Sequence, residues 1–355
     1  MARFFKKRSE MLGKRPGELV FVGKDEPVNT EAAEIRYNSE TFEKINLQDN
    51  LPDHEPDSSS GFVRWINFNG LGNIDYLNNL KKMYAIPSLI MADILNTTLR
   101  PKAEELPEGF FISLKMLHYE EEKERVASEQ ISLIADGSRL LTFQERPGDV
   151  FDPVRKRLIE SAGRIRQENA VFLTYSLLDT ITDNYIDIMQ KLAERIESID
   201  DTLSSDVNET VLNEIHLCKK ELLYLGRAIR PAREAVRIIT KESQPLIEDK
   251  YRSYFSDLIS NMVQLIETID LYKEMCNEFL SRYNGLINDK LNETIKFLTV
   301  FSVIFLPLTL ITGIYGTNFD FIPELHFRYG YLLLWISLFV ITAVMIWIFK
   351  RKKWM

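Results

Sequence analysis

The sequence predicts an α+β membrane protein with an N-terminal α/β cytoplasmic domain, a long helical stalk and two C-terminal transmembrane helices. Three observations predict this class. Two apolar runs without a charged side chain, 297–319 and 329–349, lie near the C-terminus, and about 20 apolar residues in a helix cross the hydrocarbon layer of a bilayer. Short segments rich in β-branched and aromatic residues occur in the N-terminal half, and helical periodicity runs from residue 169 into the first apolar run.

Residues 1–165 are assigned to the α/β domain, because segments of β-branched and aromatic residues alternate there with polar stretches. The expected strands are 18–23, 34–39, 62–70 and 109–119. A hairpin is expected at 130–145, with its turn at Asp136-Gly137, where glycine would supply a positive φ. Residues 76–95 predict helix, and Pro87 marks a break in it or the start of a second helix.

The next two regions are predicted to be helical. Residues 166–245 form an antiparallel helical pair, 169–203 and 209–230, because apolar residues recur there at three- and four-residue spacing among charges. Residues 246–296 form the stalk helix, and no proline interrupts its pattern before Pro307. A continuous helix from Pro245 to Pro307 would reach roughly 90 Å.

The C-terminal part is expected to cross the membrane twice. It divides into transmembrane helix 1 at 297–316, an extracytoplasmic loop at 317–328, transmembrane helix 2 at 329–349 and a basic cytoplasmic tail at 350–355. Lysines precede the first span and follow the second, so the positive-inside rule places both termini in the cytoplasm. We therefore expect a multi-pass protein of the cell inner (plasma) membrane, in contact with membrane lipid. The alternative is a pair of buried helices in a large soluble core.

The composition argues against several classes of protein. A formal net charge of -8 and a pI near 5.3 disfavour binding to nucleic acid, whereas an acidic surface suits cations. Cys218 and Cys276 lie far apart, so neither a disulfide framework nor a paired-cysteine metal site is expected. The four histidines are scattered, and no nucleophile motif, phosphate loop or dinucleotide fingerprint occurs. We do not expect an enzyme.

Small and polar residues recur every seven residues through the first span. They form two rows displaced by three positions, with Asn292 and Thr299 beginning one row and Ile295 and Ser302 the other. Small residues commonly mediate plain helix packing in bilayers, but a polar row around a symmetry axis would line a water-filled pore. The candidate pore-lining residues are Asn292, Ile295, Leu298, Thr299, Ser302, Leu306, Thr309 and Gly313.

The chain contains "YGTN" at 315–318, directly after the first span, together with "SEQISLI" at 128–134, "FQERPGDVFDPVRKRL" at 143–158 and "KKW" at 352–354. This ordered set of motifs resembles the CorA family of divalent-cation transporters, whose signature after the first span is Gly-Met-Asn in a YGMN context. The resemblance covers nearly the whole chain. It implies a homopentamer with five first-span helices around a central pore, and Mg²⁺, also Co²⁺ or Ni²⁺, as the transported ion.

The resemblance implies a selectivity mouth at Gly316, Thr317 and Asn318. Mg²⁺ sheds its waters reluctantly, so neutral carbonyl oxygens of Asn318 and of the Gly316 backbone would receive the hydrated ion. Thr317 departs from the methionine of the family, which leaves open the ion preference and whether Thr317 is natural or engineered. The runner-up is a Zn²⁺ or other transition-metal transporter of the ZntB type, although clustered histidine and cysteine ligands for tight Zn²⁺ binding are absent.

The resemblance also implies regulation by the transported ion. Asp93 and Asp257 match positions that in the family face each other across a subunit boundary and hold a divalent ion, with Asp179 as an additional ligand. Occupied sites would hold the pore closed, because two carboxylates repel unless a cation neutralises them. The non-transport alternative is a membrane-anchored helical scaffold or sensor, in which the spans serve only as an anchor.

Overall fold

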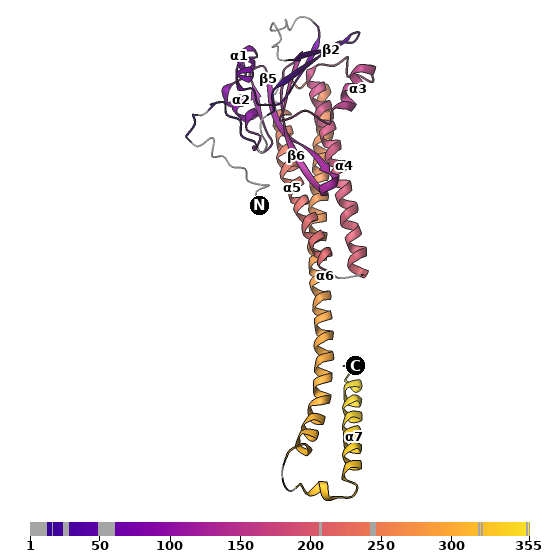
Figure 1. The fold of residues 1–355 in the computed structure, drawn as a ribbon. Helices are drawn as coiled ribbons and strands as arrows, with labels where there is room; N and C mark the ends of the chain where they lie inside the picture. The colour runs from indigo at the N-terminus through magenta and orange to yellow at the C-terminus, as the bar shows by residue number, and fades with distance from the viewer. Residues whose placement is uncertain are drawn as a thin grey trace. The chain divides into compact units, whose positions relative to one another are not determined.

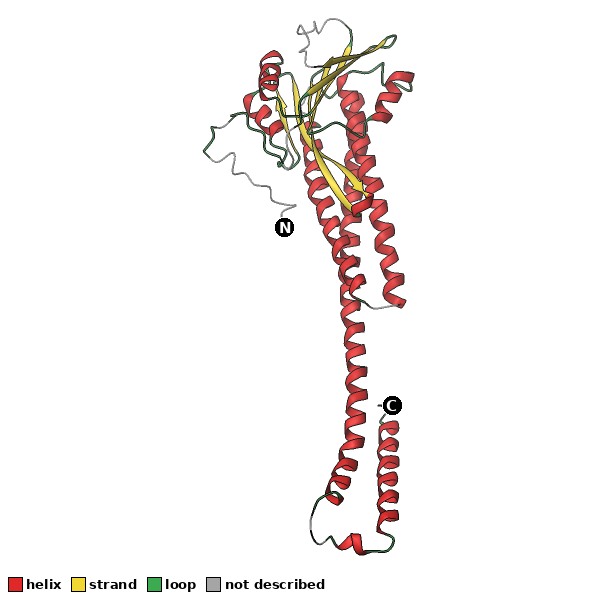
Figure 2. Cartoon of the chain, viewed as in Figure 1, coloured by secondary structure: helices red, strands yellow, loops and turns green. Residues whose placement is uncertain are grey.

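The computed structural model describes residues 13–15, 17–23, 28–48, 61–205, 208–241, 246–318, 320, 322–352 and 354. The fold is shown in Figure 1, and Figure 2 distinguishes helices, strands and loops. The chain divides into two compact units. The first comprises Met1–Asp201 and Asn213–Asn277, and the second comprises Thr202–Leu212 and Glu278–Met355.

The first unit contains one seven-stranded sheet in the order β2-β1-β3-β7-β6-β5-β4. All neighbouring strands are antiparallel except β3 and β7, which are parallel. The strands are β1 Glu31–Tyr37, β2 Phe42–Gln48, β3 Val63–Asn69, β4 Lys102–Leu106, β5 Gly109–Glu120, β6 Arg125–Ala135 and β7 Arg139–Gln144.

The hairpin predicted at 130–145 is confirmed as β6 and β7. The positive φ expected at Gly137 is wrong, because Gly137 does not lie in that region. The Asp136 side chain fixes the turn instead. Its carboxylate accepts hydrogen bonds from the backbone N–H groups of Ser138 at 2.8 Å and Arg139 at 2.7 Å, which is the local pairing that favours aspartate in turns.

Four other elements differ from the expected pattern. Residues 18–23 form no strand but a single bridge, from Val22 to Asn96. Strands β2 and β4 were not predicted, and neither was helix α3, Asp152–Glu160. Short 3₁₀ turns, η2 Glu121–Lys123 and η3 Pro323–His326, complete the connections.

Two short helices, α1 Ile74–Met83 and α2 Ser88–Leu95, pack over one face of the sheet. The break predicted at Pro87 is confirmed, because α1 ends at Met83 and Pro87 precedes the first residue of α2. The core between these helices and the sheet contains Phe68 and Phe143, whose rings stack at a centroid distance of 4.9 Å.

The first unit also contains most of the long helices α4 Ala170–Ser205 and α5 Glu209–Ile239 and the first part of α6, Asp249–Tyr315. Side-chain hydrogen bonds connect α6 to both other helices. Tyr272 of α6 donates to Glu197 of α4 at 2.7 Å. Arg230 of α5 donates to Asp270 of α6 at 2.6 Å. The sheet is joined to α5 by Glu221, which accepts a bond from a β6 backbone N–H at 2.9 Å.

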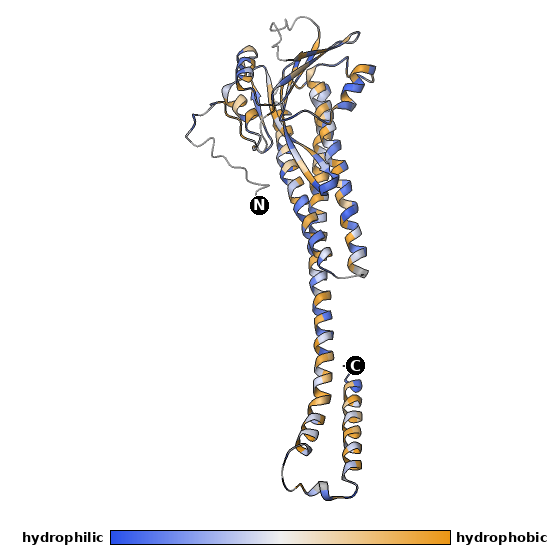
Figure 3. Ribbon diagram, viewed as in Figure 1, coloured by the Kyte–Doolittle hydropathy of each residue, from blue (hydrophilic) through white to orange (hydrophobic). Residues whose placement is uncertain are grey.

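The second unit contains the last part of α6 and helix α7, Gly330–Arg351. Both helices are long and apolar enough to cross a membrane, and only 6% of each apolar window is buried. Figure 3 shows these segments as mainly apolar, with hydrophilic residues at the C-terminal end of α7. A core helix of a soluble protein would be mostly covered by its own chain, so the exposure favours membrane spans. The α+β class with two C-terminal spans is confirmed.

Candidate ion pathway and regulatory carboxylates

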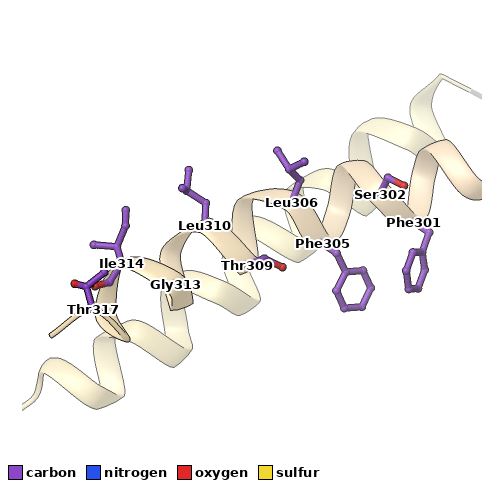
Figure 4. A pocket seen from close by; sticks show the side chains of 9 residues that line it. All are labelled: Phe301, Ser302, Phe305, Leu306, Thr309, Leu310, Gly313, Ile314 and Thr317. Atoms are coloured by element: carbon purple, nitrogen blue, oxygen red, sulfur yellow. The ribbon is translucent and has the colours of Figure 1, made fainter.

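An open groove of about 620 Å³ runs along the membrane part of α6. In Figure 4, the rings of Phe301 and Phe305 lie on one side of it, whereas Leu306, Leu310 and Ile314 project on the opposite side. Between these walls lie the small residues Ser302, Thr309 and Gly313, and Thr317 lies at one end. The groove therefore has apolar walls and a narrow floor of hydroxyl groups and exposed backbone.

The predicted pore-lining residues share this face of α6. Because a helix turns 100° per residue, all eight positions fall within an arc of about 120°. Ser302, Leu306, Thr309 and Gly313 line the groove itself. The other four, Asn292, Ile295, Leu298 and Thr299, precede it on the same continuous helix.

The hydroxyl groups on α6 are of two kinds. Thr299 donates to the carbonyl of Ile295 at 2.7 Å, and Thr312 donates to that of Leu308 at 3.0 Å, so both are satisfied by their own helix. Within the described residues, the hydroxyls of Ser302 and Thr309 make no such bond and are exposed. A hydroxyl in an apolar span needs a polar partner, so these two groups favour contact with water or with a second polar surface.

Helix α6 ends at Tyr315 in a tightened turn that carries the predicted mouth. The Gly316 N–H donates to the carbonyls of Thr312 at 3.0 Å and Gly313 at 3.2 Å. Gly316 does not have a positive φ, so the helix ends without a left-handed glycine cap. A side chain at Gly316 would place Cβ 3.3 Å from the Thr312 carbonyl oxygen. Asn318 lies two residues beyond Gly316 and is exposed.

The hydroxyl of Thr317 donates to the carbonyl of Ile314 at 2.6 Å, in parallel with a backbone bond to the same oxygen at 3.2 Å. A methionine side chain has no donor for this bond. Threonine in place of the family's methionine at position 317 therefore adds a side-chain hydrogen bond to the turn that ends α6.

Two of the predicted regulatory carboxylates lie near each other in the first unit. Partial burial and the negative charge of Asp183 raise the pKa of Asp179, and the charge of Asp257 raises it further. Burial raises the pKa of the Tyr175 hydroxyl to about 12, with contributions from Asp179 and Asp257. The side chains of Asp179 on α4 and Asp257 on α6 are therefore within electrostatic reach of one another. The sequence analysis missed Tyr175 and Asp183, although each lies four residues from Asp179 on α4 and helical spacing places all three on one face.

The third predicted ligand, Asp93, lies on α2 and forms an ion pair that the sequence analysis also missed. Lys102 Nζ is 2.5 Å from Asp93 Oδ2 and 2.5 Å from Glu104 Oε1. In the described part of the chain, no three side chains of His, Cys, Asp or Glu are grouped so as to hold a metal ion. A single copy thus does not assemble a complete ligand set among those residues.

An α+β domain followed by a long helix and two exposed apolar spans defines an integral membrane protein. A family model described as CorA-like Mg²⁺ transporter protein matches residues 61–351. The chain belongs to this family, whose members are ion transporters and not enzymes.

Three similar proteins illustrate the relationship. The cobalt/magnesium transport protein CorA of Thermotoga maritima is 34% identical over 350 residues, which cover 99% of both chains. A zinc transport protein ZntB from Pectobacterium atrosepticum is 21% identical, over 78% of this chain and 83% of that protein. The solved structure of the CorA magnesium transporter from Methanocaldococcus jannaschii superimposes on this chain with a TM-score of 0.75 and a sequence identity of 24%. The superposition covers 92% of this chain and 99% of that one.

Proposed function

We propose that the protein carries Mg²⁺, and also Co²⁺ and Ni²⁺, into the cell through a homopentameric pore lined by five copies of α6. The observation that carries the proposal is the shared face of α6, on which small and hydroxyl residues line an open groove between apolar walls. A polar face that is exposed in one copy can surround an aqueous path when several copies meet around an axis. The names of the similar Thermotoga and Methanocaldococcus proteins support Mg²⁺ and Co²⁺ as the ions.

The entrance of the pore is assigned to Gly316, Thr317 and Asn318. A ring of Asn318 side-chain oxygens and Gly316 carbonyls would bind Mg²⁺ through its water shell, because the ion gives up those waters reluctantly. Neutral oxygens suit a pathway, since five carboxylates would hold a divalent cation too firmly to release it. Asn318 is exposed three residues beyond the end of α6, which supports this role.

The closed state is assigned to apolar constrictions at Leu298 and Leu306. Both side chains are largely exposed in one copy, at 62% and 72%. In a ring of five copies these leucines would meet and exclude water, so an ion could not pass without losing its hydration.

Regulation is assigned to Asp93 and Asp257 from neighbouring copies, with Asp179 as a further ligand. Asp257 and Asp179 already interact within one chain, so a cation there would relieve their repulsion. A Mg²⁺ or Ca²⁺ ion is coordinated by carboxylate oxygens and keeps several of its water ligands. Occupied sites would hold neighbouring copies together and keep the pore closed. Loss of the ion would loosen the contacts between the copies.

The protein is assigned to the cell inner (plasma) membrane, with both termini in the cytoplasm. Lysines flank the two spans on one side, at Lys296 and Lys350, which supports this orientation. Lipid would cover the apolar surface of the spans that other copies leave exposed.

Transport is best tested with purified protein in liposomes, by competition among Mg²⁺, Co²⁺, Ni²⁺ and Zn²⁺. We expect uptake of Mg²⁺ that Co²⁺ and Ni²⁺ inhibit. Uptake of Zn²⁺ in preference to Mg²⁺ would favour the ZntB-type alternative, for which the similarity is more distant. No flux of any of these ions would favour the membrane-anchored scaffold or sensor.

A further inference from the structure

A second pocket lies in the first unit, between strands β1, β2 and β3 and the start of α3. Its volume is about 360 Å³, which is within the range of small-molecule sites. Trp65 and Asn67 of β3 line it. The residue between them, Ile66, belongs to the core beside α1 and α2. Because successive side chains of a strand point to opposite faces, the pocket lies on the other face of the sheet.

One wall of this pocket comes from the motif at 143–158, which the proposed ion pathway does not use. The wall carries the carboxylates of Asp149 and Asp152 and the guanidinium of Arg155. The Asp149 side chain is only 5% exposed, and its oxygens accept hydrogen bonds from Arg155 at 2.6 Å and from two further groups. Asp152 is 90% exposed, and its Oδ1 accepts from Arg155 at 3.0 Å. Its Oδ2 has no partner in the described part of the chain, so it can accept from a ligand.

The fourth charged residue of the lining is Lys44, on the edge strand β2. It is exposed, and among the described residues its ammonium group makes no ion pair or hydrogen bond. With Lys44, the lining has two positive and two negative charges, so they cancel. Glu31 of β1, in register with Asn69, is exposed and does not line the pocket. The pocket therefore offers one available charge of each sign, from two different elements.

Two asparagines of β3 add hydrogen-bonding groups to the floor. Asn67 is 7% exposed, and its Nδ2 donates to Asn69 Oδ1 at 3.0 Å. Asn69 is partly exposed, and its own Nδ2 has no partner within the described residues. Ile35 and the Trp65 ring contribute apolar surface beside these amides. The floor thus has an available amide donor next to a small apolar area.

We propose that this pocket binds a free α-amino acid with a hydrogen-bonding side chain. The α-carboxylate would accept from Lys44, the ammonium group would donate to Asp152, and the side chain would accept from Asn69. A ligand with one charge of each sign matches a lining whose charges cancel. A simple anion or cation would leave one of the two available charges without a partner, and an uncharged ligand would leave both.

The test is isothermal titration of the full-length protein in detergent with L-glutamine as the probe, and we expect saturable binding. Two derivatives that each lack one charge should bind at least threefold more weakly. These are N-acetyl-L-glutamine, which has no ammonium group, and L-glutaminamide, which has no carboxylate. L-Leucine, a zwitterion without a side-chain acceptor, should also bind more weakly. Absence of saturable binding up to millimolar L-glutamine, or equal binding of any of the other three compounds, would overturn the proposal.

Lys44→Met tests the cationic side of the pocket without threatening the fold, because this side chain is exposed on an edge strand and has no described partner to lose. We expect unchanged thermal stability without ligand, and binding of L-glutamine that is about three- to fivefold weaker, the effect of losing one exposed ion pair. Binding of L-glutaminamide, which has no carboxylate for Lys44 to contact, should not change.

Asp152→Asn is the reciprocal variant, which should weaken binding of L-glutamine and leave that of N-acetyl-L-glutamine unchanged. Lys82→Met, on an exposed position of α1, is the matched control and should bind like the parent protein. Equal affinity of Lys44→Met and this control for L-glutamine would contradict the assignment. So would a Lys44→Met variant that binds L-glutamine and L-glutaminamide more weakly by the same factor.

Discussion

Lys102 Nζ lies 2.5 Å from Asp93 Oδ2, so the carboxylate proposed to bind a regulatory ion is already paired with an ammonium group. Burial tends to lower the pKa of Lys102, but hydrogen bonds to Asp93 and Glu104 outweigh burial and raise it. The ammonium therefore stays charged. A divalent cation that binds Asp93 has to displace this group or bind against its repulsion.

Replacing Lys102 should consequently strengthen regulation by Mg²⁺. We expect Lys102→Met to lower the Mg²⁺ concentration that protects the protein from proteolysis by about two- to fivefold, because a partly exposed ion pair contributes up to about 1 kcal/mol. Lys82→Met, on an exposed position of α1, is the matched control. Protection of Lys102→Met at the same or a higher Mg²⁺ concentration would show that the pair does not compete with the ion.

Asp179 should make stability depend on pH. Burial first, and Asp183 next, raise the pKa of Asp179 above its ordinary value of 3.8. The folded protein then holds a proton that the unfolded chain releases, so Asp179 disfavours folding as the pH rises through the window from 3.8 to the raised pKa. We expect Asp179→Asn to raise the thermal unfolding temperature of the metal-free protein at pH 7 and to flatten its dependence on pH.

The same Asp179→Asn variant should gain less stability from added Mg²⁺ than the parent, since one ligand is lost. Asp187→Asn, on the same helix with a 62% exposed side chain, is the control and should behave like the parent. If both variants respond to pH and Mg²⁺ in the same way, Asp179 is only a surface charge.

Local patterns predicted much of this fold, and their failures have local physical reasons. The break at Pro87 followed from backbone chemistry that needs no tertiary contact. The β6–β7 hairpin was found from its local Asp136-Gly137 turn pattern, in which the Asp136 side chain and not a positive φ at glycine fixes the turn. Strands β2 and β4 were missed because they are the two edges of the sheet, and their charged, half-exposed sequences lack the apolar alternation that marks a strand.

Some parts of the candidate site could likewise be predicted from local sequence patterns, and others could not. The seam on α6 was predictable because one helix carries it, and a seven-residue period describes a helix face. Tyr175 and Asp183 could have been found, because each lies four residues from Asp179 on the same helix α4. Lys102 was not predictable, since its contact with Asp93 joins helix α2 to strand β4 and no short pattern in the sequence records such a contact.

A polar group at the proposed constriction should admit water. We expect Leu306→Ser to raise the basal Mg²⁺ leak of proteoliposomes several-fold, because a hydroxyl hydrates a site that leucine keeps dry. Leu333→Ser, on an exposed position of α7, is the control for inserting serine into a span. Reduced thermal stability of Leu306→Ser without any leak would mean that Leu306 packs against a neighbour.

Thr317 should influence ion preference through its bond to the Ile314 carbonyl, which contributes about 1 kcal/mol in a typical case. We expect Thr317→Met to change the ranking of Mg²⁺, Co²⁺, Ni²⁺ and Zn²⁺ in uptake while the oligomer and its thermal stability are kept. Thr317→Val, which keeps the shape and removes the hydroxyl, separates loss of the bond from the effect of a longer side chain. The same ranking in all three forms would show that this position is permissive.

The most direct test of the account is Mg²⁺ uptake by liposomes that contain Asn318→Ala. If Asn318 receives the hydrated ion, uptake should fall to the level of empty liposomes, while the variant elutes as the same oligomer as the parent. Asn261→Ala, in the first part of α6, should transport normally. Parental uptake by a correctly assembled Asn318→Ala protein would contradict the central claim that the end of α6 forms the selective entrance of a pore.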